Sequence, residues 1–418
     1  MATASHDVAV VGGGIVGAAC AFMLSERGLD VLLIDRGEPQ RAASWGNAGH
    51  FAYEQILPLA SPGLWRDLPR LLFGRQSPLS IPPRSLWTLA PWLVRFFWNT
   101  RPAQMRKATA ALASLLAEAP GAWQRLADAA DLQALIRTGP ILVVAQDPAA
   151  LAAKRPTMEL FKRHGITVEE TDPSSARAIE PMLRPDIAGA FVYPRAQYTI
   201  DPASLTRKLV EAFVRTGGVV AGDEVVSVRV LPSDVVAVAG RSGSWTARQA
   251  VVAAGIGSRS ILRSLGIGVP LAAERGYHLM VPPGASKRTV GVPLIGARPE
   301  FVITPMAHGL RLAGTVELAR SDSRPEWARA SMLGKLAERL VGPLDGLRDA
   351  SSWMGCRPTL PDSLPAVGRI PGAPQIIAAF GHQHLGLTLA AITGELVSAI
   401  AVRAEPSIDL APFSVARF

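Results

Sequence analysis

The hydrophobic positions at the start of the chain form two short runs, separated by a glycine-rich turn and a mostly apolar stretch. Residues 7–11 (DVAVV) predict a strand, and residues 18–27 predict a helix that ends at Gly28. Residues 31–34 predict a second strand, which Asp35 follows directly. This order of strand, turn, helix and strand is typical of a parallel sheet covered by helices.

Two later stretches extend the same pattern. Residues 250–258 (AVVAAGIGS) predict a buried strand that ends near Gly255 and Gly257. Residues 376–379 predict another strand, which leads through FGHQHLG into a helix over 387–402. Because the three groups lie at the beginning, middle and end of the chain, we expect one discontinuous domain built from all of them.

The glycines of the first turn fit a dinucleotide-binding fingerprint. Gly12 permits the tight turn, Gly14 lets the backbone approach a diphosphate, and Gly17 lets the helix pack closely on the strand. The helix N-terminus offers unpaired N–H groups to the anion. Asp35 is placed to accept hydrogen bonds from an adenosine ribose, and an acid at this position disfavours the 2′-phosphate of NADP.

The second strand continues into a loop over 36–50 that is rich in small residues, RGEPQRAASWGNAGH. A simple NAD domain continues with further alternating strands and helices, so this loop indicates a larger cofactor lying against it. The late helix adds a positive N-terminal end, which can stabilise negative charge on a reduced flavin. We therefore expect FAD rather than NAD.

Composition narrows the remaining classes. A chain of 418 residues suits two domains, and its net charge of +9 comes from scattered arginines rather than basic clusters, which argues against nucleic-acid binding. The two cysteines, Cys20 and Cys356, predict no disulfide framework and are compatible with a reducing cytoplasm. No secretion signal, nucleophilic triad or metal-ligand spacing is recognisable, so we expect a cytoplasmic protein without a metal site.

Seven short motifs are distributed along nearly the whole chain. They are GGGIVG with its acid, SWGNAG, AIEP at 178–181, AAGIGS, GLRLAGTVE at 309–317, GCRPTLPDSLPAVG at 355–368 and GHQHLGLTLA. Together they resemble the D-amino acid dehydrogenase, glycine oxidase and sarcosine oxidase family of FAD enzymes, the DAO family. In GNAGH and GHQHLGLT the sequence is most similar to bacterial D-amino acid dehydrogenases, including those acting on D-proline and D-hydroxyproline.

The resemblance implies an α/β fold, α+β overall, with a Rossmann-type FAD-binding domain and an antiparallel-sheet substrate domain. The FAD domain is expected over 1–80, 185–268 and 350–418, and the substrate domain over 81–184 and 269–349. The fingerprint and the resemblance together assign FAD contacts to Gly12, Gly14, Ile15, Val16, Gly17, Asp35, Arg36, Ser44, Asn47, Ala48, Gly49, Val225, Gly255, Gly381, His384, Leu385, Gly386, Leu387 and Thr388.

Relatives that attach flavin covalently carry a cysteine shortly before a Pro-Asp pair. When Pro361 and Asp362 are aligned with that pair, Gly355 occupies the cysteine position and Cys356 lies one residue away. We therefore expect non-covalent FAD, with Cys356 as a small buried residue.

Oxidation of an amino acid requires a cation to bind the carboxylate, and Arg357 lies at a position that resembles the family's carboxylate site. Tyr277 and His278 are neighbours in a predicted strand, so only one of them can face the substrate. We favour Tyr277, with Arg275 on its face as a second carboxylate contact. His278 is either a substrate contact or a structural residue.

Histidines follow both loops that are expected to face the flavin. His50 ends SWGNAGH, and His382 and His384 flank Gln383 in the last turn. A histidine near the reacting atoms can accept a proton or orient the amine, but it can also cap a helix. We assign His50 and His384 as candidate catalytic residues and Gln383 as a substrate contact.

The predicted reaction is hydride transfer from the α carbon of a small amino or imino acid to FAD, with a D-amino acid such as D-proline or D-hydroxyproline as the preferred substrate. Two alternatives remain open. One is an oxidase of glycine or N-methylglycine, and the other is a non-catalytic FAD subunit of a larger dehydrogenase. The electron acceptor, a quinone or oxygen, and the oligomeric state are also open.

Residues 85–98 (SLWTLAPWLVRFFW) are strongly apolar but too short to span a bilayer. Three placements are open for this stretch: the core of the substrate domain, a roof over the active site, or a peripheral membrane contact through residues 85–107. The basic residues Arg101, Arg106 and Lys107 follow it and would suit anionic lipid.

Overall fold

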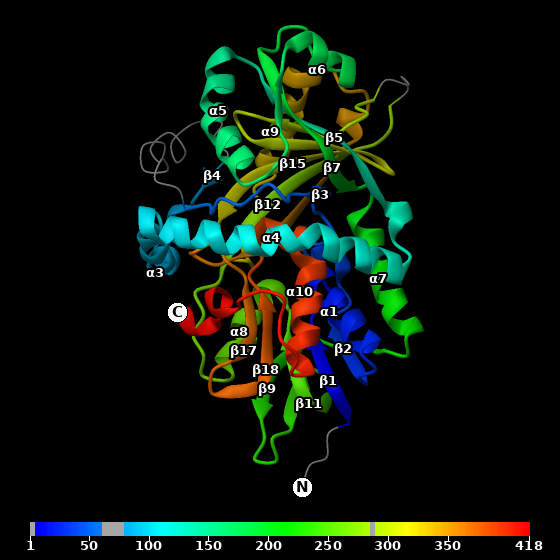
Figure 1. Ribbon diagram of the computed structural model, residues 1–418, viewed down its shortest axis with the longest axis vertical. Helices are drawn as coiled ribbons and strands as arrows, with labels where there is room; N and C mark the ends of the chain where they lie inside the picture. Colours follow the sequence, from blue (N-terminus) through cyan, green and yellow to red (C-terminus); the bar gives the residue numbers. More distant parts are fainter. Residues whose placement is uncertain (1–4, 61–78, 285–288) are drawn as a thin grey trace.

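The computed structural model describes residues 5–60, 79–284 and 289–418 of the chain, which form two sheet-based bodies stacked along the long axis (Figure 1). The lower body contains the N-terminus and an open, mostly parallel sheet. The upper body contains a larger, mostly antiparallel sheet. A long helix crosses the molecule between them (Figure 1).

The lower sheet has the strand order expected of a doubly wound fold, with β1 at its centre between β11 and β2. Its strands are β17 (Ala366–Ile370), β18 (Ala373–Phe380), β11 (Ser244–Val252), β1 (His6–Val11), β2 (Val31–Asp35) and β8 (Val219–Gly222). In addition, β10 (Val236–Gly240) pairs with β11, and β9 (Val225–Val230) pairs with β10. Strands β18, β11, β1, β2 and β8 run parallel to one another. Strands β1, β2, β11 and β18 come from the three sequence groups that the hydrophobic pattern joined into one domain, and β8 adds a strand that this pattern did not mark.

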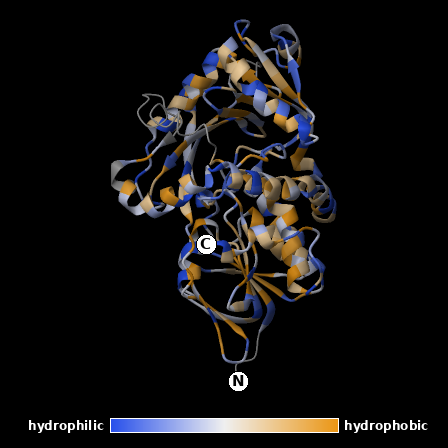
Figure 2. Cartoon of the chain, turned by 60° about the vertical axis from the view of Figure 1, so that its left-hand side comes forward, coloured by the Kyte–Doolittle hydropathy of each residue, from blue (hydrophilic) through white to orange (hydrophobic). Residues whose placement is uncertain are grey.

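Helices α1 (Ile15–Glu26), α7 (Pro202–Arg215) and α10 (Gly386–Ala401) pack in one core cluster against this sheet, and α8 (Ser258–Arg263) belongs to the cluster of the other face. Burial on both faces explains why β1 and β2 are continuously apolar. In Figure 2 the strands and helices of this body are predominantly hydrophobic. The stretch Gln383–Ala401 is long and apolar enough to cross a membrane, but 83% of it is buried inside the protein.

The upper sheet is curved and combines segments from along the whole chain. Its order is β16 (Ser351–Thr359), β12 (Ala272–Val281), β15 (Gly309–Leu318), β14 (Phe301–Met306), β13 (Leu294–Gly296), β5 (Ile136–Ala145), β7 (Gly189–Thr199) and β3 (His50–Phe51), with β4 (Leu79–Ser80) and β6 (Glu169–Thr171) at its margins. Three helices contact this sheet: α5 (Pro148–Arg163), α6 (Pro173–Ile179) and α9 (Ala328–Val341).

Four strands of the upper sheet lie outside the ranges expected for the substrate domain. The sequence placed residues 185–268 and 350–418 with the FAD-binding part, but β7 and β16 pair within the upper sheet. Two short strands from the expected 1–80 segment also belong to this sheet, since β3 pairs with β7 and β4 pairs with β15. The chain therefore crosses between the two bodies more often than the expected boundaries allow.

Helices α3 (Pro83–Asn99) and α4 (Pro102–Ala130) form the belt between the two bodies. The buried side chains of α4 recur every three or four residues, as expected for an amphipathic helix. Trp123 of α4 donates from its indole Nε1 to the carbonyls of Leu387 and Thr388, each 3.0 Å away. The belt is thereby fixed to the first turn of α10, at the level where the two sheets meet.

Candidate functional site

The turn between β1 and α1 can accept only glycine at two of its predicted positions. Gly12 has a φ of +106°, and a Cβ added there would lie 2.6 Å from the carbonyl oxygen of Ala253. A Cβ added at Gly17 would lie 1.8 Å from the carbonyl oxygen of Gly12. Strand, turn and helix therefore approach one another too closely for any side chain, as in a diphosphate-binding turn.

The N-terminus of α1 is arranged to present amides. The helix begins with Ile15 and Val16. The residue before it, Gly14, has no side chain that could cap the helix amides. The Ile15 amide donates to the Ser44 hydroxyl at 2.9 Å, which places the loop after β2 over the helix start. An anion at this end of the helix could accept hydrogen bonds from backbone amides that have no carbonyl acceptor within the helix.

Asp35 closes the same turn at the end of β2. Its carboxylate accepts from the Gly13 amide at 2.7 Å and from the Gly37 amide at 2.9 Å, so its oxygens are held beside the glycine turn. A hollow of about 480 Å³ opens beside it, at the C-terminal end of β8. The lining residues are Arg36, Glu38, Arg41, Gly222, Asp223, Glu224, Arg241 and Ser242, and Val225 follows directly in β9.

The loop over 44–49 is held against one face of the upper sheet by three strands. The Ala48 carbonyl accepts from Thr304 Oγ1 at 2.7 Å, and the Asn47 carbonyl accepts from Arg311 Nη1 at 2.6 Å. A ring nitrogen of His278, Nδ1, lies 3.0 Å from the Gly46 carbonyl. Within the loop, Asn47 Oδ1 accepts from the Gly49 amide at 2.7 Å. The loop thus runs between the two bodies, as expected for a segment that lies along a flavin.

The last glycine turn reaches the same region from the other side. Gly381 has a φ of +84° and Gln383 a φ of +51°. The buried Gln383 amide nitrogen Nε2 has no hydrogen-bond partner in the described part of the chain. His382 pairs as an isolated bridge with Thr359, at the end of β16. This bridge brings the start of α10, which carries Leu385, Gly386, Leu387 and Thr388, against the strand that carries Arg357.

Arg357 lies on the face of the upper sheet that meets the start of α10. Its Nη1 donates to Glu274 Oε1 at 2.8 Å, and Glu274 Oε2 accepts from Thr359 Oγ1 at 2.9 Å. A Cβ added at Gly276 would lie 2.6 Å from Arg357 Nη2, so the guanidinium packs directly over this glycine. The Arg357 side chain is 26% exposed whereas that of Glu274 is 5% exposed. Glu274 therefore anchors Arg357 through one guanidinium nitrogen, and the Arg357 side chain as a whole remains partly exposed.

Tyr277 and Arg275 lie on the opposite face, which corrects their expected placement beside Arg357. Strand β12 pairs with β16 so that Glu274 lies opposite Arg357, whereas Arg275 lies opposite Cys356. The Tyr277 hydroxyl bonds to the Glu317 carboxylate and accepts from the Glu326 amide. Arg275 is fully buried, with its Nη1 3.2 Å from Glu317. These two side chains stabilise the packing of the sheet beside α9 and do not reach Arg357.

His278, which the sequence left open, shares the face of Glu274 and stacks on Trp353, with ring centroids 4.8 Å apart. Burial lowers the pKa of His278 to about 3, with a further contribution from the nearby charge of Arg311. His278 is therefore a neutral residue that holds the Gly46 loop. Its contact with the loop indicates a structural role.

His384 lies close enough to Arg357 and His50 for their charges to affect its pKa. Burial lowers the pKa of His384, and the charges that act on it include Glu274, Arg357, Glu300 and His50. His50 Nε2 lies 3.6 Å from Glu54 Oε2 in a buried pair. The atoms His50 Nε2 and Glu54 Oε1 have no hydrogen-bond partner among the described residues. Unpartnered buried polar atoms at such a place fit a site that is completed by a ligand.

Three residues of this region escaped the sequence reasoning. Glu274 lies in the strand predicted around Tyr277 and His278, Arg311 lies in the 309–317 motif, and Glu54 follows the GNAGH loop. Each is a buried charged residue, since Glu54 is 6%, Glu274 4% and Arg311 8% exposed. The alternation of β12 shows that Glu274 and His278 share a face, but not which face is turned to the cofactor.

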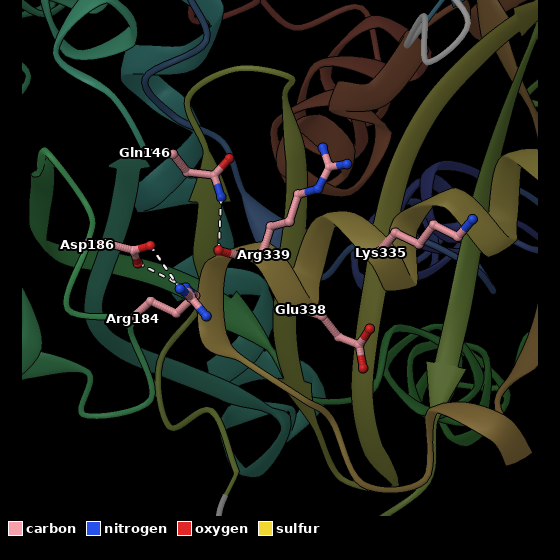
Figure 3. Close-up of a pocket in the computed structure, with 6 residues that line it drawn as sticks. All are labelled: Gln146, Arg184, Asp186, Lys335, Glu338 and Arg339. Carbon is pink, nitrogen blue, oxygen red and sulfur yellow. Dashed lines mark hydrogen bonds and ion pairs between the residues drawn. The ribbon is translucent and has the colours of Figure 1, made fainter.

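A second hollow, of about 610 Å³, lies on the outside of the upper body and contains no predicted site residue. Figure 3 shows the Arg184–Asp186 ion pair and the hydrogen bond from Gln146 to the Arg339 carbonyl at its rim. Lys335 and Glu338 of α9 complete the lining. Arg184 and Asp186 pair with each other at the surface, and the hollow is separate from the glycine turns.

Comparisons with known proteins agree with this geometry. The chain is 33% identical to a D-amino-acid oxidase of Bradyrhizobium diazoefficiens over 99% of both chains. It is 29% identical to D-amino acid dehydrogenase 2 of Ralstonia nicotianae over 98% of this chain and 100% of that protein. The crystal structure of glycine oxidase from Geobacillus kaustophilus shares the fold, with a TM-score of 0.76, 22% identity and 100% coverage of both chains.

A family model described as DAO, FAD dependent oxidoreductase, matches residues 7–400. This match covers both glycine turns, the loop between the two bodies and strand β16. The chain therefore belongs to the DAO family of FAD-dependent oxidoreductases.

Proposed function

We propose that this FAD-dependent amino acid oxidoreductase oxidises a small D-amino or D-imino acid, with D-proline and D-hydroxyproline as the preferred substrates. The observation that supports the proposal is Arg357, a partly exposed guanidinium anchored by a buried carboxylate beside the last glycine turn. The names of the D-amino-acid oxidase and dehydrogenase relatives support the D configuration. The cyclic substrate rests on the resemblance of GNAGH and GHQHLGLT.

The residues that are present fit FAD. The diphosphate would be held by the amides from Gly14 to Gly17 at the start of α1, and the ribose by Asp35. The adenine end would lie by Arg36 and Val225, beside the hollow described above. Ser44 to Gly49, Gly255 and the turn from Gly381 to Thr388 would hold the flavin end. When bound, FAD supplies the acceptor for the hydride that leaves the substrate α carbon.

Arg357 and the buried polar side chains around it perform the remaining tasks. Arg357 binds the substrate carboxylate through the guanidinium nitrogens that do not bond to Glu274. His384 stays neutral because burial lowers its pKa, so it places no positive charge beside the amine and offers a ring nitrogen as acceptor. His50 and Gln383, each with an unpartnered polar atom, line the same region and orient the amine.

The experiment that tests this function is anaerobic bleaching of the flavin by matched D- and L-amino acids. Bleaching by D-proline and D-hydroxyproline, with little effect of their L forms, is the expected result. Preferential bleaching by glycine or N-methylglycine would assign the chain to the small-amine oxidases. A yellow protein that no amino acid bleaches would contradict the proposal and favour an accessory subunit.

A further inference from the structure

Helix α3 has one face in the core and one in solvent. Leu89 and Trp92 are buried in a cluster with Ala272 and Leu318 of the upper sheet. The Trp92 indole Nε1 donates to the Thr359 carbonyl at 3.2 Å. Of the three placements that the sequence left open for this stretch, the core therefore accounts for one face only.

The other face of α3 exposes large apolar side chains at helical spacing. Trp87 is 88% exposed, Val94 69% and Trp98 55%. These positions are seven and four residues apart, so they follow one stripe along the helix. The helix lies at the edge of the molecule, beside the start of α4 (Figure 1). Large exposed apolar groups arranged in this way mark a binding surface.

The segment that carries this face contains basic residues and no acidic ones. Residues 79–117 contain no Asp or Glu. Arg95 of α3 is exposed, as are Arg101 and, in the first turns of α4, Arg106 and Lys107. The Arg101 guanidinium carbon lies 3.2 Å from the centre of the Trp98 ring, so a basic residue and an aromatic ring share one site at the end of the helix.

We propose that the exposed face of α3 docks the enzyme onto the surface of an anionic lipid bilayer. Tryptophan prefers the headgroup level, and basic residues beside an amphipathic helix attract anionic lipid. Association of two copies through this face would bring the arginines of both copies together without an acid in 79–117 to offset them. Lipid phosphates provide the compensating charge.

Docking in this way places the site close to the bilayer surface. Trp92 lies on the inner side of α3 and bonds to the Thr359 carbonyl, two residues beyond Arg357 in β16. The same helix would thus contact lipid with its outer face and support the strand of the proposed substrate site with its inner face. The inference extends the proposed function, but it is tested independently of turnover.

The test is co-flotation of the holoenzyme with vesicles of phosphatidylcholine, with or without phosphatidylglycerol. We expect binding only where phosphatidylglycerol is present, and weaker binding at high salt. The double variant Trp87→Ser, Trp98→Ser should lose flotation while keeping flavin absorbance. Arg101→Gln and Lys107→Gln should each weaken binding about fivefold, which corresponds to roughly 1 kcal/mol per charge.

Trp327→Ser is the matched control, because Trp327 is a 46% exposed tryptophan on the other side of the upper sheet, next to α9. It should float like the wild type. The proposal is overturned if wild-type holoenzyme does not bind phosphatidylglycerol vesicles, or if Trp327→Ser reduces flotation as much as the α3 variants do. A concentration-dependent dimer that dissociates in the Trp87→Ser, Trp98→Ser variant would also overturn it, because the face would then bind a second copy.

Discussion

At the scale of single residues, the central feature is a guanidinium held by a carboxylate that is more deeply buried than itself. Glu274 accepts from both Arg357 and Thr359, so its two oxygens are fixed. Arg357 is consequently oriented from one side before any substrate binds. We therefore regard Glu274 as a positioning residue for the proposed carboxylate contact.

Replacing Arg357 with Lys should weaken substrate binding by about 2 to 4 kcal/mol, because a point charge cannot form two parallel hydrogen bonds with a carboxylate. Glu274→Gln should raise KM less than Arg357→Lys, since the amide can still accept from Arg357. Steady-state kinetics and flavin content of both variants are the measurements.

Arg184→Lys is the control, because Arg184 forms an exposed pair with Asp186 on the outside of the upper body. Its kinetics should match the wild type. Normal KM and kcat in Arg357→Lys would remove this residue from the substrate site.

His382 predicts a pH dependence of stability. It is buried, its Nε2 lies 3.0 Å from Thr393 Oγ1, and burial lowers its pKa to about 3. An unfolded histidine titrates near pH ~6.5, so between about pH 6.5 and 3 the unfolded chain binds a proton that the folded chain does not. The free energy of unfolding should therefore fall as the pH is lowered through this window. Above the window, His382 should contribute no pH dependence.

The measurement compares unfolding of the holoenzyme at pH 7 and pH 5. The wild type should lose about 2 kcal/mol more over this interval than His382→Asn, because 1.5 pH units at roughly 1.4 kcal/mol each are removed by the substitution. His308→Asn, at an exposed histidine, should follow the wild type. Equal pH dependence in His382→Asn and the wild type would show that His382 does not contribute.

At the scale of elements, the β1–α1 turn and the start of α1 leave no room for a side chain at Gly12 and Gly17. Gly17→Ala would push its methyl group into the Gly12 carbonyl, whereas Gly14→Ala would approach only the Ser44 hydroxyl, at 3.3 Å. We expect Gly17→Ala to cost about 1 to 3 kcal/mol through overpacking and to reduce FAD binding more than Gly14→Ala does. Titration of apoprotein with FAD, with circular dichroism to verify folding, measures both effects. Equal FAD affinity of the two variants would contradict this account of the turn.

Helix α3 places some of its apolar side chains in the core and others on the surface. The apolar stretch 85–98 reads as uniformly hydrophobic, yet Trp92 belongs to the core and Trp87 and Trp98 to the surface. The sequence did not separate these tryptophans. Their separation follows from the rotation of the helix about its axis, which its packing on Ala272 and Leu318 determines.

At the scale of the whole molecule, covalent attachment of the cofactor depends on the face of the upper sheet on which the Cys356 side chain lies. Cys356 lies opposite Arg275 in the sheet, and Arg357 lies opposite Glu274, so the cysteine and the proposed carboxylate contact point to opposite faces. Burial also raises the pKa of the Cys356 thiol. We therefore expect FAD to be bound without a covalent link. Acid precipitation should release all yellow colour into the supernatant, and colour retained in the pellet would contradict this prediction.

The sequence by itself determined the features that depend on local backbone geometry. The glycines at 12, 14 and 17, Asp35 and the late turn before α10 could be recognised because a tight turn, a close approach and a helix N-terminus each require particular residue types at fixed spacing. The fold class followed from the same local signals. The distribution of the later strands between the two sheets could not be predicted from these signals, because hydrophobicity shows that a strand is buried but not which partner buries it.

Only the tertiary structure decided the composition of the candidate site. In β12, alternation requires Tyr277 and His278 to face opposite ways, but the choice of face depends on pairing with β16 and on the packing of α9 against the other side. That pairing groups Glu274 and His278 with Arg357 and leaves Tyr277 and Arg275 with Glu317. A register shared by strands about 80 residues apart is a long-range property, and no local pattern in the sequence carries it.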